Sequence, residues 1–124
     1  KIKIYENISE DMKIHFLNRA GVFVLPSIYE GTPTTLLEAM AYGKAVVCSN
    51  LPSTEPLVKE NFNGFLVNLD SKDVGKEFAE KINFLLLNKN LAKKMGERNQ
   101  KIVKQYSWER IYRRIDKIYK EVAG

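Results

Sequence analysis

Short apolar runs alternate with helical patterns along the first half of the chain. Each run has the length and the β-branched or aromatic content of a buried strand. The runs are IKIY at 2–5, VFVL at 22–25, AVVC at 45–48 and GFLV at 64–67. Because helical segments separate them regularly, the pattern predicts parallel βαβ units, and so an α/β fold with a parallel sheet of about four strands.

Residue types at the ends of the intervening segments predict where two helices begin and end. The first helix is expected to start at Ser9, a favourable N-cap, and to end near Gly21. The second is expected to have Thr32 as its N-cap, Pro33 at its first helical position and Gly43 just past its end. Both helices fit between the predicted strands.

The strand pattern stops after residue 70. From residue 71, apolar residues recur at intervals of three and four, which predicts three amphipathic helices at the C-terminus. The last of these is capped by Ser107, and its aromatic stripe is expected to pack in the core. The chain is thus interpreted as a single domain over 1–124, with βα units over 1–70 and terminal helices over 71–124.

Length and composition limit the size of this fold. With 124 residues and 44% hydrophobic content, the chain can bury one modest core. Four strands are few for a doubly wound sheet, which usually has five or six, so we expect the missing strands to precede Lys1, where an initiator methionine is also absent. No apolar run approaches the roughly 20 residues of a membrane span, and no leader opens the chain, so a soluble protein is expected.

The net charge of +5 is concentrated at the C-terminal end. Residues 88–124 contain eleven basic and four acidic residues, whereas residues 1–87 contain nine basic and eleven acidic ones. The helical spacing of the basic residues favours a solvated helix face, and the alternative is peripheral contact with the inner face of a membrane. No motif for nucleic acid accompanies the charge. The single cysteine, Cys48, is expected to be buried, and it fits a cytoplasmic protein.

Candidate chemistry is concentrated in SIYEGTPTTLLEAMAYG, at residues 27–43. This segment follows the predicted strand at 22–25, and ligands of open α/β sheets bind at the carboxyl ends of the strands. The start of the following helix offers backbone amides and a helix dipole to phosphate oxygens. These amides belong to Gly31, Thr32, Thr34 and Thr35. Gly31 also leaves room for a bulky ligand.

Two carboxylates flank this helix start. Glu30 and Glu38 would repel phosphate, but each can accept charge-assisted hydrogen bonds from neighbouring hydroxyls of a sugar, worth roughly 1.5–3 kcal/mol each. A nucleotide-sugar, with two sugar rings on either side of a diphosphate, suits one carboxylate per ring. Two alternatives stay open: a chance spacing in a chain with 11 glutamates, and a hydrolase that uses the pair as acid and base.

A longer stretch carries a family resemblance. VFVLPSIYEGTPTTLLEAMAYGKAVVCSN resembles the donor-site signature of the retaining family 4 glycosyltransferases of GT-B architecture, with an E-x7-E pair formed by Glu30 and Glu38. STEPLV, NGFLV, Asp70 and SWERI follow in the order found in the family. The resemblance covers essentially the whole chain and aligns it with the latter part of the C-terminal, Rossmann-like donor-binding domain.

The resemblance implies a role for each matching residue. Glu30 would be the catalytic-site glutamate that contacts hydroxyls of the transferred sugar, and Glu38 would hold the nucleotide ribose. Gly31 and Thr32 match backbone positions that approach the sugar and the diphosphate. Pro33 departs from the glycine-rich family pattern and removes an amide there. The chemistry implied is hexosyl transfer, with retained configuration, from a UDP-, GDP- or ADP-sugar to an acceptor glycan or lipid, as in polysaccharide synthesis.

No cofactor is expected beside the donor substrate. The chain has one histidine, one cysteine and no Asp-x-Asp motif, so no protein-held metal is expected. The family's acceptor domain, and the Arg and Lys that offset the diphosphate charge, match no segment of this chain. The chain alone is therefore expected to bind donor weakly and to catalyse nothing. The remaining alternatives are a non-catalytic sugar-nucleotide-binding or assembly module, a nucleotide-sugar epimerase and a glycoside hydrolase.

Overall fold

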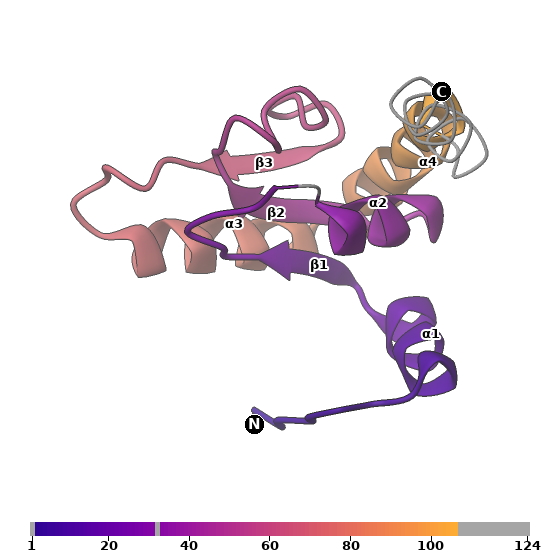
Figure 1. The fold of residues 1–124 in the computed structure, drawn as a ribbon. Helices are drawn as coiled ribbons and strands as arrows, with labels where there is room; N and C mark the ends of the chain where they lie inside the picture. Colours follow the sequence, from indigo (N-terminus) through magenta and orange to yellow (C-terminus); the bar gives the residue numbers. More distant parts are fainter. Residues whose placement is uncertain (1, 32, 107–124) are drawn as a thin grey trace, which may run out of the picture.

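A computed structural model describes residues 2–31 and 33–106 of the chain (Figure 1). Helices and strands alternate from α1 to β2, β3 follows β2 with no helix between them, and two helices come last, an order that confirms the predicted α/β class. The elements are α1 (Glu10–Arg19), β1 (Val22–Leu25), α2 (Thr34–Ala41), β2 (Ala45–Ser49), β3 (Gly64–Val67), α3 (Val74–Leu87) and α4 (Lys89–Gln105).

The sheet is parallel, with the strand order β1-β2-β3. The central strand, β2, is buried along its whole length, and its side chains alternate between two apolar layers. Val46 and Cys48 pack with the apolar side of α2, whereas Ala45 and Val47 pack with residues of α3 and α4. Burial on both faces explains why the sequence of β2 is a continuous apolar run rather than an alternating one.

One strand prediction is wrong. Residues 2–5 form no strand, and Ile2 and Ile4 are 92% and 82% exposed. A β-strand exists only when a neighbouring strand accepts and donates its backbone hydrogen bonds. The N-terminal segment runs apart from β1 (Figure 1). The ring centroids of Tyr5 and of Phe16 on α1 lie 4.9 Å apart. The described sheet therefore has three strands instead of about four.

The helix predictions hold with small shifts. Ser9 caps α1, because its Oγ accepts a hydrogen bond of 3.2 Å from the Met12 amide. Helix α2 begins at Thr34, and the carbonyl of Pro33 accepts its first helical bond, so Pro33 is the cap rather than the first helical residue. The expected cap at Thr32 lies outside the described residues. Gly43 ends α2 with a φ of 72°, as predicted.

The C-terminal part contains the first two of the three predicted helices, α3 and α4. The third, expected from Ser107 onward, lies outside the described residues. Among the helices that the structure describes, none has both the length and the apolar character needed to cross a membrane. The buried position predicted for Cys48 is confirmed, and burial raises the pKa of its thiol to about 12.

Helix α4 is fixed against the end of α2 by a close backbone contact and a buried polar network. A Cβ atom on Gly96 would lie 1.9 Å from the carbonyl oxygen of Gly43, so the two backbones touch. Asn99 donates hydrogen bonds to the carbonyl oxygens of Lys44 (2.7 Å) and Asn63 (2.9 Å), and it accepts one from Asn63 Nδ2 (2.8 Å). These contacts set the position of α2 relative to the sheet.

Candidate functional site

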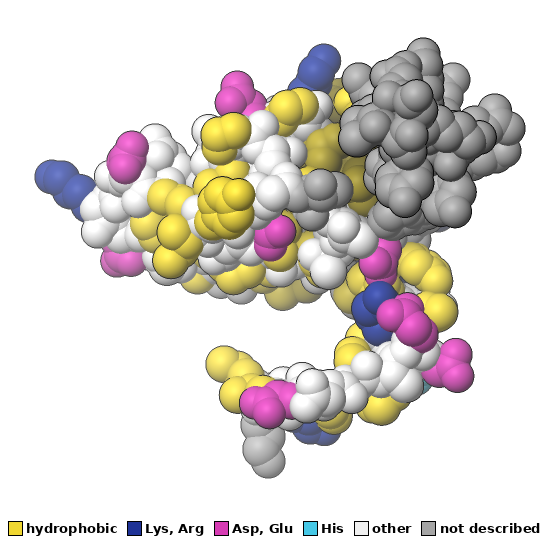
Figure 2. All heavy atoms as spheres, viewed as in Figure 1, with side chains coloured by type: hydrophobic (Ala, Val, Ile, Leu, Met, Phe, Trp, Pro, Cys, Tyr) yellow, Lys and Arg dark blue, Asp and Glu magenta, His cyan; other side chains and the backbone are white. Residues whose placement is uncertain are grey.

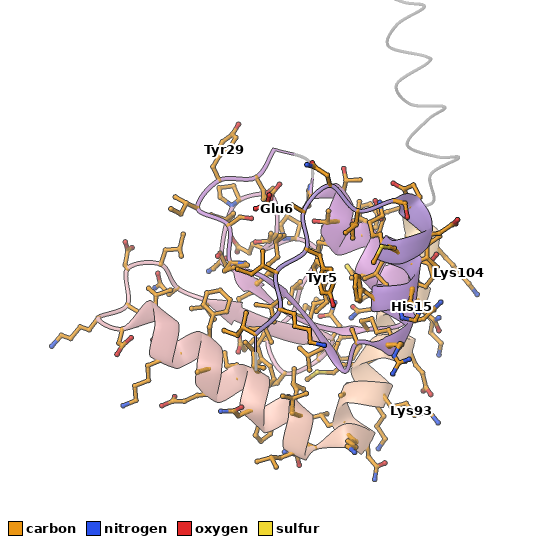
Figure 3. All side chains as sticks on the ribbon, turned by 90° about the horizontal axis from the view of Figure 1, so that it is seen from below. Tyr5, Glu6, His15, Tyr29, Lys93 and Lys104 are labelled. Carbon is orange, nitrogen blue, oxygen red and sulfur yellow. The ribbon has the colours of Figure 1, made fainter. Side chains whose placement is uncertain are left out.

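The candidate site begins where β1 ends. Residues 26–33 connect the carboxyl end of β1 to the start of α2, which is the edge at which ligands of parallel sheets bind. Ile28 and Tyr29 in this loop are 84% and 85% exposed, and Tyr29 extends away from the ribbon (Figure 3). Pro33, by contrast, is buried at the base of the loop. The loop is thus anchored at Pro33, and its middle is open to solvent.

Glu30 is held by a neighbour within the same loop. The hydroxyl of Ser27 donates a hydrogen bond of 2.8 Å to Glu30 Oε1, and both residues are half-buried. A carboxylate has several acceptor positions, so this bond leaves Oε2 able to accept from a ligand hydroxyl. The role of Ser27 as a partner of Glu30 was missed from the sequence. A hydroxyl three residues before an acid within one loop is a signal that could have found it.

Glu38 lies in the second turn of α2, where it meets α1. The ammonium of Lys13, on α1, lies 3.0 Å from Glu38 Oε2 and 2.9 Å from Glu10 Oε1. These two carboxylates raise the pKa of Lys13, with the hydrogen bond to Glu10 as the larger cause. Acidic and basic side chains gather over α1 in this region (Figure 2). Lys13 was also missed from the sequence, because 25 positions separate it from Glu38.

The remaining predicted site residues lie at the turn into α2. A Cβ atom added to Gly31 would meet nothing within 4 Å, so the space beside this residue is open. Thr34 and Thr35 form the first turn of α2 with exposed side chains, and the first amides of a helix point out of its N-terminus. Thr32 lies outside the described residues. The structure therefore places the helix start and the free space at the same loop.

The described residues contain no group of three or more His, Cys, Asp or Glu side chains that could hold a metal ion. His15 lies on α1 and packs edge-on against the ring of Phe16 at 5.7 Å (Figure 3). Glu30 and Glu38 are each engaged with a different polar neighbour.

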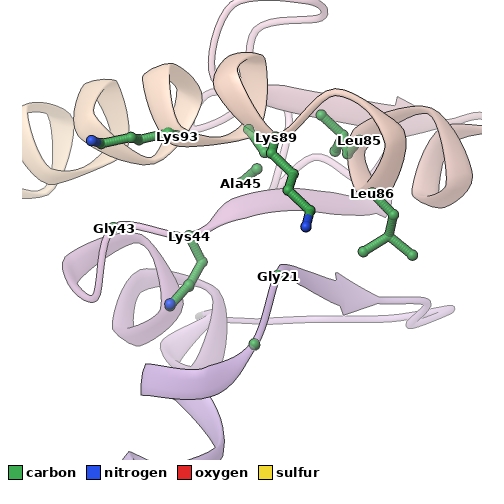
Figure 4. Close-up of a pocket in the computed structure, with 10 residues that line it drawn as sticks. Gly21, Gly43, Lys44, Ala45, Leu85, Leu86, Lys89 and Lys93 are labelled. Carbon is green, nitrogen blue, oxygen red and sulfur yellow. The ribbon is translucent and has the colours of Figure 1, made fainter.

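A separate hollow of about 310 Å³ lies at the other end of the sheet, beside the starts of β1 and β2. Lys89 reaches across it toward Gly21, whereas Lys93 points away from it (Figure 4). Leu86 and Ala45 supply part of its apolar lining. Because it is at the amino ends of the strands, this hollow is not part of the loop site at the carboxyl ends.

Comparison with known proteins identifies similar sequences that are about three times longer. Residues 1–102 match the family described as "Glycosyl transferases group 1". Alpha-maltose-1-phosphate synthase of Mycobacterium tuberculosis H37Rv is 34% identical over 112 residues, which are 87% of this chain and 29% of that protein. The Escherichia coli UDP-Gal:alpha-D-GlcNAc-diphosphoundecaprenol alpha-1,3-galactosyltransferase is 42% identical over 59 residues, which are 48% of this chain and 15% of that protein.

A solved structure shows the same fold. Sucrose-phosphate synthase from Thermosynechococcus elongatus superposes with a TM-score of 0.83 at 24% identity, and the match covers 97% of this chain and 30% of that one. The fold agrees with the α/β arrangement described above, and the chain spans about a third of the length of the proteins that it matches. By its sequence match over residues 1–102, this chain belongs to the group 1 glycosyl transferases.

Proposed function

We propose that the chain is the donor-binding portion of an enzyme that transfers a sugar from a nucleotide-sugar to an acceptor glycan or lipid, with retention of configuration. The observation that carries the proposal is the position of two glutamates around the start of α2, at the carboxyl end of β1. Glu30 is oriented by Ser27 at 2.8 Å and keeps a second oxygen for the transferred sugar. Glu38, one turn into α2, would accept hydrogen bonds from the ribose.

The diphosphate between the two sugars would lie at the first turn of α2. Amides at a helix start favour anions, and the open space beside Gly31 allows the ligand to approach the backbone. No protein-held metal is part of the proposed site. The charge of the diphosphate would be offset mainly by basic residues outside this chain, since a helix terminus alone contributes only about 0.3–1 kcal/mol at an exposed site.

The donor is proposed to be a UDP-, GDP- or ADP-sugar, with a hexosyl group transferred. The name of the E. coli relative contains UDP-Gal and a lipid-linked acceptor, which supports this donor class and a role in surface polysaccharide or glycolipid synthesis. A lipid-linked acceptor would place the enzyme in the cytoplasm with peripheral contact at the inner membrane face. The basic residues beyond residue 88 would favour such a surface.

A longer protein is proposed to complete the fold. The residues of β1 are only partly buried, whereas every residue of β2 is buried. Among the described residues, β1 pairs with a neighbour on one side only. Upstream strands would pair with its other edge and cover Ile2 and Ile4, and an N-terminal domain would bind the acceptor. On this proposal, the 124 residues alone bind donor weakly and do not catalyse transfer.

The test uses the full-length protein and a screen of UDP-, GDP- and ADP-sugars, with the transferred product detected by mass spectrometry and its anomeric configuration by NMR. Glu30→Gln should reduce turnover by about a hundredfold or more, and Glu38→Gln should mainly raise the KM for the donor. Glu80→Gln, an exposed glutamate of α3, is the matched control and should leave both parameters unchanged. Normal turnover in Glu30→Gln, or no consumption of any nucleotide-sugar by the unaltered protein, would contradict the proposal.

A further inference from the structure

Lys13 makes direct contact with the carboxylate that is proposed to hold the ribose. Its ammonium lies 3.0 Å from Glu38 Oε2 and joins α1 to α2 at the site. The side chains of Lys13 and Glu38 are 31% and 22% exposed, so both are partly covered but still reachable by a ligand. A second carboxylate, Glu10, lies 2.9 Å from the same ammonium. The roles proposed for Glu30 and Glu38 do not explain why a lysine lies beside Glu38.

The hydrogen-bonding capacity of the pair fits a vicinal diol. An ammonium has three donors and no acceptor, and a carboxylate has only acceptors. Lys13 donates a hydrogen bond to Glu10 and forms an ion pair with Glu38, so these contacts occupy at most two of its three donors. Glu38 uses Oε2 for Lys13, and Oε1 remains for another donor. The pair therefore offers one donor and one acceptor side by side, whereas each ribose hydroxyl both donates and accepts.

We propose that Lys13 and Glu38 together form the subsite for the ribose 2′ and 3′ hydroxyls of the donor nucleotide, with Lys13 as a ligand-binding residue. This inference rests on the proposed function, because it assigns a residue to the nucleotide end of that same site. Glu38 would accept a hydrogen bond from one hydroxyl, and Lys13 would donate one to the oxygen of its neighbour. Lys13 of α1 thus supplies the hydrogen-bond donor that Glu38, as a carboxylate, cannot provide to the ribose.

Charge gives a second reason for a lysine at this position. Glu10, Lys13 and Glu38 form a cluster with a net charge of −1, which becomes −2 without the lysine. A diphosphate bound at the start of α2 would be repelled more strongly by the larger charge. Because the two carboxylates raise the pKa of Lys13, the ammonium stays charged at neutral pH and above. Lys13 therefore reduces the electrostatic cost of placing carboxylates beside an anionic ligand.

The competing explanation is that Lys13 only joins α1 to α2 and does not contact a ligand. The binding of deoxynucleotides distinguishes this structural role from the ribose-binding role. Calorimetry on the full-length protein would measure the Kd for UDP and for 2′-deoxy-UDP, with the GDP and ADP pairs measured in parallel. The unaltered protein should bind the ribonucleotide about tenfold more tightly than the deoxynucleotide, the size expected for one hydrogen bond to a charged group. Lys13→Met should weaken ribonucleotide binding about tenfold and largely remove this difference.

Two further variants make the result specific. Lys13→Arg retains the charge and the donors and should keep most of the preference for the ribonucleotide. Lys93→Met removes an exposed lysine of α4 and should change neither Kd. Thermal unfolding of each variant checks that the fold is retained. If Lys13→Met proves unfolded, Lys13→Gln, which keeps a hydrogen-bond donor without the charge, should show a smaller preference than Lys13→Arg.

The outcomes distinguish this inference from the function on which it rests. An unchanged Kd in folded Lys13→Met, or equal weakening of both nucleotides, would overturn the ribose subsite while sugar transfer by the full-length protein still supported the proposed function. If the unaltered protein bound none of the three ribonucleotides, the proposed function and the ribose subsite would both be overturned. A preference for ribonucleotide that depends on Lys13 and survives in Lys13→Arg would support the inference.

Discussion

Replacing Gly96 with alanine should destabilise the protein, although alanine is the better helix former. Inside a helix, alanine is favoured over glycine by about 1 kcal/mol. The new Cβ would lie 1.9 Å from the carbonyl oxygen of Gly43, whereas a carbon and an oxygen ordinarily approach to roughly 3.3 Å. Helix α4 would have to move back by roughly 1.4 Å, the difference between these two distances.

This movement would also disturb the buried polar network one turn further along α4. Asn99 makes hydrogen bonds of 2.7–2.9 Å to Lys44 and Asn63, and a buried polar group that loses its partner costs about 1–3 kcal/mol. Overpacking itself costs about 1–3 kcal/mol. After subtraction of the gain in helix propensity, Gly96→Ala should lower the free energy of unfolding by about 1–5 kcal/mol.

Urea unfolding followed by circular dichroism would measure this loss as a shift of the midpoint at unchanged slope. Gly75→Ala is the matched control, because a Cβ there meets only Asp73 Oδ1 at 3.8 Å, an ordinary contact. The same substitution in α3 should leave stability unchanged or raise it by up to about 1 kcal/mol. If Gly96→Ala were as stable as the unaltered protein, the account of how α4 fixes the end of α2 would be wrong.

Three further predictions concern the site and the core. Ser27→Ala in the full-length enzyme should lower kcat about tenfold at little change in KM, because Glu30 loses the bond that orients it, and Ser27→Thr should restore part of the rate in a steady-state assay. Gly31→Ala should change the free energy of unfolding by less than about 0.5 kcal/mol, since the added methyl meets only open space in the free protein, but it should weaken donor binding in calorimetry. Equal donor affinity would show that no ligand approaches this residue. Burial raises the pKa of the Cys48 thiol to about 12 from an ordinary value of 9.0. The stability that the buried neutral thiol contributes is therefore complete below pH 9 and is lost as the pH rises toward 12. Urea midpoints measured across this range should show the loss, and Cys48→Ala should remove it.

Local signals in the sequence were enough to predict most of the helices and three strands. Ser9 caps α1 within its own first turn, and Gly43 ends α2 because it adopts a positive φ. In such cases a residue acts on the backbone within four positions, so the amino-acid type alone is informative. The runs that became β1, β2 and β3 were predicted from their apolar content, and α2 and α3 cover the faces of the central strand.

Features that depend on distant partners were not predictable in the same way. The run at 2–5 has the composition of a strand, but no neighbouring strand pairs with it in the part of the chain that the structure describes. Glu30 and Glu38 were predicted as site residues, and their roles stay predictions. The contact of Glu38 with Lys13 depends on how α1 packs against α2, which no local pattern specifies. The bond from Ser27 to Glu30 is local and could have been anticipated.

The outer edge of β1 has a practical consequence for handling these 124 residues on their own. In the part of the chain that the structure describes, no strand pairs with this edge, so its amide and carbonyl groups form a template to which a strand of another molecule can add. At the concentrations used for purification, such addition would yield dimers or larger aggregates, and the exposed Ile2 and Ile4 would favour them. A proline at a position of β1 whose amide faces away from β2 would block that self-association without touching the loop after the strand.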